Sequence, residues 1–232
     1  MIPTPIVALD VPTAVDAVRL VESLGARCRF YKVGLELFTA VGPSVVASII
    51  ERGADVFLDL KLHDIPNTVR AAARSAAGLG VRLLTIHGIG GPEMIEAAVD
   101  GGGTQVGILA VTVLTSVDDA SLARSSGRVG VVVSDEVARL AAVARDARAH
   151  GVVCSGVEAG ALHAQYGNQL ALLVPGIRMS GGASHDQRRV VTPAQAAAAG
   201  ARYIVVGRAV TSAADPPAAM ERVLEELPSV SA

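Results

Sequence analysis

The sequence has few cysteines, no long apolar run and no pattern typical of a signal peptide at its start. Its two cysteines, Cys28 and Cys154, are isolated from each other, so they form neither a disulfide framework nor a metal-binding motif. The longest apolar stretch, residues 106–114, is about half of the roughly 18 residues that a membrane-spanning helix needs. The N-terminus carries neither the charged region nor the small-residue cleavage site of a signal peptide. These absences predict a soluble, cytoplasmic protein.

The sequence also lacks an excess of charge. Twenty Lys and Arg residues against 22 Asp and Glu residues give a formal net charge of −2, and the basic residues form no tail or run. Duplex nucleic acid and anionic membranes attract concentrated positive charge. We therefore expect neither as a partner.

What the sequence has in quantity is short β-branched runs, each followed by an Ala-rich segment with helical spacing. The apolar runs predict eight strands, at residues 6–10, 29–34, 55–62, 82–88, 105–114, 152–156, 170–176 and 203–208. The segments between them predict helices at residues 13–24, 43–52, 66–78, 92–100, 134–148, 158–165, 192–199 and 212–227. Thr13 with Asp16 three residues later, and Pro193 behind Thr192, are typical helix starts.

Strands that are apolar throughout and alternate with amphipathic helices predict a parallel sheet covered by helices. Eight such units in 232 residues fit one (β/α)8 TIM barrel, a single domain over residues 1–232. A doubly wound open sheet is the alternative. That fold usually has fewer strands, and the first predicted strand is not followed by the G-x-G-x-x-G of a dinucleotide-binding version.

Charged residues interrupt the predicted strands near their carboxyl ends, where the active site of such a barrel lies. The stretch "FLDLKLHDIPNTV" (57–69) puts Asp59 and Lys61 two residues apart, so both would point to one face, about 6.5 Å apart along the strand. Asp64 follows in the loop, Asp10 closes the first strand, and Lys32 lies inside the second. We expect these five charges to converge, because alternating signs compensate the cost of burial. Lys61, held between carboxylates, would then be a general acid; a purely structural ion-pair network is the alternative.

The loops after the seventh and eighth predicted strands suggest a phosphate site. Such loops commonly bind phosphate in these barrels. Gly207 and Arg208 stand at the end of the eighth strand, and a guanidinium suits a phosphate dianion. The loop after the seventh strand, residues 176–193, is long and Gly-rich and carries Arg178 and Gln187. That composition is typical of a lid over an anion, although an ordinary solvated loop has the same basic residues.

Six segments resemble landmarks of the orotidine 5′-phosphate decarboxylase family, in its order and spacing. The segment "DLKLHDIPNTV" matches the family signature D-x-K-x-x-D-I-P-x-T. The other matches are "VALD" (7–10), "YKVGLELF" (31–38), "VTVLTS" (111–116), "PGIR" (175–178) with "DQRR" (186–189), and "VVGRAV" (205–210). The resemblance implies decarboxylation of orotidine 5′-phosphate to UMP, the last step of de novo UMP synthesis, by a homodimer with shared active sites. It also implies no metal and no organic cofactor.

The resemblance further implies a role for each matched residue. Lys61 would stabilise and protonate a C6 carbanion, with Lys32, Asp59 and Asp64 as the rest of the charge network and Asp59 near the departing carboxylate. Asp10 and Lys32 would hold the ribose, and Thr115 and Ser116 would contact the pyrimidine. Asp64, Ile65 and Thr68 would reach into the partner subunit's site. The residues expected to bind the phosphate or the closing loop are Arg178, Gln187, Gly207 and Arg208.

The chain departs from the family pattern at two positions, and two other functions are compatible with the same fold. Met179 stands where many relatives have Pro, and Val117 where they have Met, which leaves the rigidity of the lid open. A Mg²⁺-dependent sugar-phosphate decarboxylase or aldolase of the same superfamily would share the charge motif, but "IPNT" and "DQRR" argue against it. A non-catalytic nucleotide-binding barrel would be expected to have lost members of the charge set, and all are present.

Overall fold

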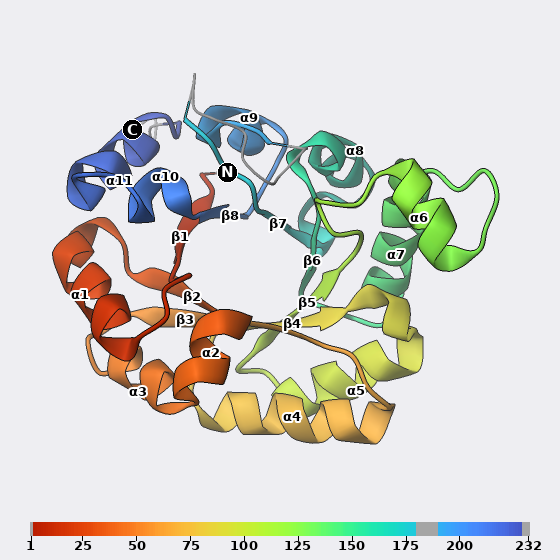
Figure 1. The fold of residues 1–232 in the computed structure, drawn as a ribbon. Coiled ribbons are helices and arrows are strands. Elements are labelled where there is room, and N and C mark those ends of the chain that lie inside the picture. Colours follow the sequence, from red (N-terminus) through yellow and green to blue (C-terminus); the bar gives the residue numbers. More distant parts are fainter. Residues whose placement is uncertain (1, 180–189, 229–232) are drawn as a thin grey trace.

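The chain folds into a ring of strands enclosed by helices (Figure 1). The computed structural model describes residues 2–179 and 190–228. Eight parallel strands close into a barrel in chain order, β1 pairing with both β2 and β8. The strands are β1 (Thr4–Ala8), β2 (Phe30–Gly34), β3 (Asp55–Leu62), β4 (Leu83–His87), β5 (Gly107–Val111), β6 (Gly151–Val153), β7 (Ala171–Val174) and β8 (Tyr203–Val206). The predicted TIM barrel is confirmed, and each observed strand overlaps its predicted run.

The helices cover the outside of this barrel. The α-helices are α1 (Ala14–Leu24), α2 (Leu35–Val41), α3 (Ser44–Ile50), α4 (Pro66–Gly78), α5 (Pro92–Gly102), α6 (Asp119–Ser126), α7 (Val133–Asp146), α8 (Gly156–Tyr166), α9 (Pro193–Ala198), α10 (Arg208–Thr211) and α11 (Pro216–Glu225). Short 3₁₀ turns lie at Gly25–Arg27, Gly88–Gly90 and Gly167–Gln169. The sequence did not predict α2, α6 and α10, which have seven, eight and four residues. Segments of about two turns or fewer show little helical periodicity. α3 and α9 are as short but lie within longer predicted segments, and Thr192 with Pro193 marked the start of α9. None of the helices in the described ranges is long and apolar enough to cross a membrane.

Two predicted helix starts have the expected caps. The Thr13 hydroxyl accepts a hydrogen bond from the Asp16 N–H at 3.1 Å, which satisfies one of the free donors at the start of α1. Thr192 and Gln195 form a reciprocal capping box at α9, with Pro193 in the first turn. Both caps are local, and this is why the sequence alone revealed them.

The barrel interior has an apolar floor, which is a layer of buried apolar side chains below the polar residues of the cavity. Its lower layers are filled by Ile6, Ala8, Phe30, Phe57, Leu83, Leu109, Leu173 and Val205. Side chains alternate along a strand, so the residue two positions after each of these also faces inward. Lys32 thus lies above Phe30, and Asp59 above Phe57. Strand alternation therefore carries the charged residues to the carboxyl end of the barrel.

Candidate active site

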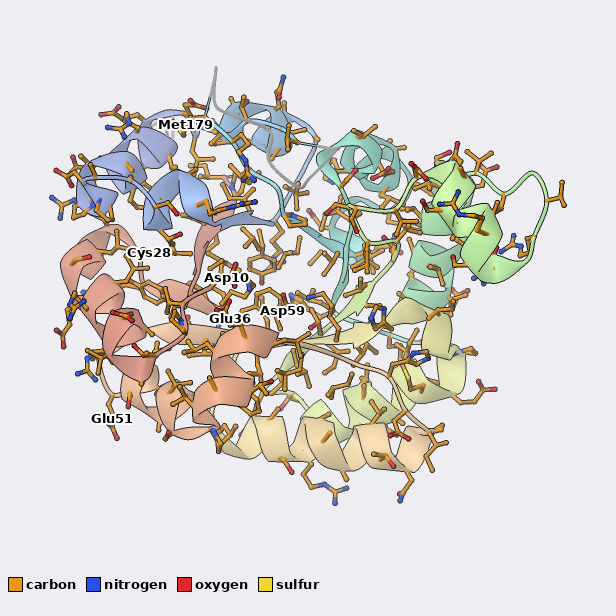
Figure 2. The ribbon with its side chains drawn as sticks, in the orientation of Figure 1. Asp10, Cys28, Glu36, Glu51, Asp59 and Met179 are labelled. Atoms are coloured by element: carbon orange, nitrogen blue, oxygen red, sulfur yellow. The ribbon has the colours of Figure 1, made fainter. Side chains whose placement is uncertain are left out.

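A cavity of about 270 Å³ opens at the carboxyl ends of the strands. Residues from seven of the eight strands, or from the loops after them, line it. Its charged and hydroxyl-bearing lining residues are Asp10, Lys32, Asp59, Lys61, Thr115, Arg178 and Arg208. In Figure 2, Asp10 and Asp59 lie near the middle of the ring of strands. The cavity therefore contains most of the side chains that the sequence singled out.

Four of the charges form a row of alternating sign. Asp10 Oδ1 lies 2.8 Å from Lys32 Nζ, Lys32 Nζ lies 3.8 Å from Asp59 Oδ2, and Asp59 Oδ1 lies 2.8 Å from Lys61 Nζ. The side chains of Lys32 and Asp59 are only 11% and 13% exposed. Each charge that is removed from water has an opposite charge beside it, so the row offsets the cost of burial. The predicted convergence of these four residues is observed.

The geometry at Lys61 differs from the prediction. β3 pairs with β4 at Leu58 and Leu84 and next at Leu62 and Ile86, so three residues of β3 stand opposite one residue of β4. Lys61 has φ of 50°, in the left-handed region that is uncommon for residues with a side chain. The regular spacing expected between Asp59 and Lys61 along the strand therefore does not apply, but both residues line the cavity, as the sequence predicted. Lys61 Nζ lies 2.8 Å from Asp59 Oδ1.

Asp64 does not lie in the charge row of its own chain. Its carboxylate accepts a hydrogen bond from the Ile65 N–H at 2.6 Å, and among the described residues only Asp59 forms an ion pair with Lys61. Asp64, Ile65 and Thr68 are all exposed and do not line the cavity. The physical reason is that β3 ends at Leu62, so Asp64 and Ile65 lie in the turn before α4 and Thr68 lies in its first turn. The expectation that Asp64 completes the network is not met within one subunit.

Some of the residues expected to bind the pyrimidine and the phosphate line the cavity, and others do not. Thr115 lines the cavity, whereas its neighbour Ser116 is exposed and does not. Arg178, Gly207 and Arg208 line the cavity at the ends of β7 and β8. Gln187 and most of the predicted lid lie outside the described residues. The cavity thus has two guanidinium groups on the side that the sequence assigned to phosphate.

His87 adds no charge to the row at neutral pH. It ends β4, and its ring centroid lies 5.7 Å from that of His63. Burial lowers the pKa of His87 below its ordinary value, and the His63 ring and the Lys61 ammonium lower it further. A neutral imidazole is the expected form.

Three site residues gave no sequence signal that we recognised. A Cβ atom on Gly34 would lie 2.7 Å from Lys32 Nζ, so the glycine leaves room for the Asp10–Lys32 pair. Cys154 lines the cavity and is buried. Thr85 hydrogen-bonds to both Asp59 and Lys61. Its inward position after Leu83 was the available signal.

Comparison with known proteins identifies the family of this chain. A family model described as "Orotidine 5'-phosphate decarboxylase / HUMPS family" matches residues 3–223. The chain belongs to this family. The resemblance drawn from six short segments is thereby confirmed over nearly the whole chain.

Individual relatives agree with the family match. The orotidine 5'-phosphate decarboxylase of Anaeromyxobacter sp. (strain K) is 50% identical over 218 residues, which are 93% of this chain and 94% of that protein. The enzyme of the same name from Methylorubrum extorquens (strain PA1) is 46% identical over 222 residues, 96% of this chain and 94% of that one. The crystal structure of orotidine 5'-phosphate decarboxylase from Lactobacillus acidophilus has a TM-score of 0.85 at 37% identity and covers 97% of this chain and 99% of its own.

The two departures from the family pattern are packing positions. Met179 and Val117 are partly buried and pack against the main hydrophobic core. Neither lines the cavity.

In the described part of the chain, no three His, Cys, Asp or Glu side chains come together as a candidate metal site.

Proposed function

We propose that this protein decarboxylates orotidine 5'-phosphate to UMP and CO₂. The observation that carries the proposal is the row Asp10–Lys32–Asp59–Lys61 in a cavity that also contains Arg178 and Arg208. Relatives named orotidine 5'-phosphate decarboxylase, at up to 50% sequence identity among those compared, support it. The row suits a reaction that needs fixed charge, and the guanidinium groups suit a substrate with a phosphate.

The chemistry assigned to the row is stabilisation and protonation of a carbanion. When CO₂ leaves C6, the electron pair of the broken C–C bond stays on C6. The Lys61 ammonium stabilises this pair electrostatically and then transfers a proton from Nζ to C6, which gives UMP. Asp59 keeps the ammonium aimed through the 2.8 Å contact. Because these charges are fixed before the reaction, they need no reorganisation in the transition state.

The rest of the cavity is assigned to binding. Asp10 and Lys32 hold the ribose hydroxyls, and Thr115 contacts the pyrimidine. Arg178, Gly207 and Arg208 take the phosphate, together with Gln187. The phosphate is remote from C6, so its binding energy is available to close the loop over the substrate.

We further propose a homodimer with shared sites in the cytoplasm. Leu35, Ile65, Ile89 and Leu114 are large apolar residues that are 42–66% exposed. They follow β2, β3, β4 and β5, four neighbouring strands, so they lie along one part of the rim. An exposed apolar rim of this kind supports a subunit interface, and Asp64 and Thr68 lie within the same rim.

Two buried cysteine thiols suit a reducing compartment.

The proposed activity is tested by following the loss of orotidine 5'-phosphate absorbance with EDTA-treated protein. We expect full turnover without added metal, because the row itself supplies the charge. Hexulose 6-phosphate and 3-keto-gulonate 6-phosphate, with and without Mg²⁺, are the control substrates. Complete loss of activity after chelation and its recovery with Mg²⁺ would instead favour the sugar-phosphate enzymes.

A further inference from the structure

Thr85 carries a buried hydroxyl group in the interior of the barrel. It lies in the middle of β4, two residues after Leu83 of the apolar floor. It is fully buried and is not among the residues that line the cavity. A buried hydroxyl is costly unless it is hydrogen-bonded, so its partners indicate its role.

Both partners belong to the charge row. The Thr85 hydroxyl donates to Asp59 Oδ1 at 2.8 Å and accepts a hydrogen bond from the backbone N–H of Lys61 at 2.9 Å. Asp59 Oδ1 also receives Lys61 Nζ at 2.8 Å. One side chain thus fixes the carboxylate that aims Lys61 and, at the same time, the main chain that carries Lys61.

The bulge explains why a side chain is needed here. Asp59, Leu60 and Lys61 stand opposite the single residue Thr85 between the two paired positions of β3 and β4. The regular ladder is interrupted there, and the Thr85 hydroxyl takes the Lys61 N–H. Left-handed backbone conformations at residues other than glycine persist only where the surroundings hold them. Thr85 supplies this support at Lys61.

We propose that Thr85 is a positioning residue, whose hydroxyl holds the Lys61 backbone and the Asp59 carboxylate in the geometry required for proton transfer to the substrate. The inference rests on the proposed role of Lys61. It differs from a merely structural role, in which loss of the hydroxyl would lower stability and leave turnover unchanged.

The test compares Thr85→Val, which removes the hydroxyl at similar size, with Thr85→Ser, which keeps it. Thr112→Val is the matched control, because Thr112 is also buried and its hydroxyl donates to the Val153 carbonyl at 2.8 Å. We expect Thr85→Val to lower kcat about 10- to 100-fold, as misplaced catalytic groups do, with little change in KM or UMP affinity. Thr85→Ser and Thr112→Val should stay close to the unaltered protein. If Thr85→Val is not recovered folded, Thr85→Cys, whose thiol is a weak hydrogen-bonding group, should show the same loss in smaller degree.

A second readout follows the backbone directly. The chain has two lysines, Lys32 and Lys61, so a sample labelled with ¹⁵N-lysine gives two backbone amide signals. Lys61→Ala assigns them. In Thr85→Val, the Lys61 amide should exchange with solvent at least about 10-fold faster, because its acceptor is gone, while the Lys32 amide is unchanged.

The outcomes separate the two proposals. A kcat of Thr85→Val (or of Thr85→Cys in its place) within about threefold of Thr112→Val, or an unchanged Lys61 amide, would overturn the role of Thr85. If Lys61→Ala itself retained turnover, the proposed chemistry of Lys61 would fall first, whatever Thr85 does.

Discussion

At the scale of single residues, the choice of basic side chain is informative. Eighteen of the 20 basic residues are arginine, and the two lysines are Lys32 and Lys61. Both lie in the cavity. An arginine guanidinium stays protonated in proteins, whereas a lysine ammonium can give up a proton. The use of lysine at position 61 therefore fits a proton donor better than a purely structural ion pair.

We predict that Lys61→Ala abolishes turnover and leaves UMP affinity within about tenfold, roughly 1.4 kcal/mol. The lysine acts on the carbanion, which the product no longer has. Lys61→Arg keeps the positive charge but not the transferable proton, so it should also be inactive. Steady-state turnover and UMP titration by calorimetry measure the two effects. A substantial remaining kcat in either variant would remove the general-acid assignment.

At the scale of elements, the backbone conformation just after α7 affects the free energy of unfolding of the protein. Arg148 follows α7 and precedes β6, so it lies at the amino end of the strands, opposite the cavity. Its φ is 59°, and its N–H bonds to the Arg145 carbonyl at 2.9 Å. Helices commonly end with glycine in this conformation, because a Cβ atom there costs about 1 kcal/mol or more.

Arg148→Gly should therefore stabilise the protein by about 0.5–1 kcal/mol, since the gain is partly offset by the greater freedom of glycine in the unfolded chain. For a domain of this size the melting temperature should rise by about 1–4 °C. Arg148→Ala is the control, because alanine keeps the Cβ atom and should show no such gain. Differential scanning calorimetry measures both, and kcat should not change. Equal melting temperatures for the two variants would show that backbone strain is not the cause.

At the scale of the whole molecule, the outward position of Asp64 is the basis of the proposed dimer. Asp64 and Thr68 are exposed on the rim of their own barrel, which also carries the exposed apolar residues Ile65 and Ile89. An isologous dimer would place each rim against the partner's cavity, reciprocally. Asp64 would then serve the site of the other chain.

Complementation tests this arrangement. Subunits carrying Lys61→Ala and subunits carrying Asp64→Ala should each be inactive alone. After mixing, about half of the dimers are heterodimers, and one of their two sites has only intact residues, so roughly a quarter of all sites should be active. Tagged subunits verify the exchange. Activity that stays at background after verified exchange would mean that Asp64 serves its own barrel.

The sequence by itself determined the barrel and the inventory of its site. Apolar runs, helix caps and charges at strand ends depend on neighbours within a few residues, so strand alternation sufficed to bring Asp10, Lys32 and Asp59 into one cavity. The tertiary structure alone decided the bulge at Lys61 and the support from Thr85. Both depend on which residue of another strand stands opposite, and Lys61 and Thr85 are 24 residues apart in the sequence. Such pairing is set when the barrel closes, and a periodic pattern along one strand does not contain it.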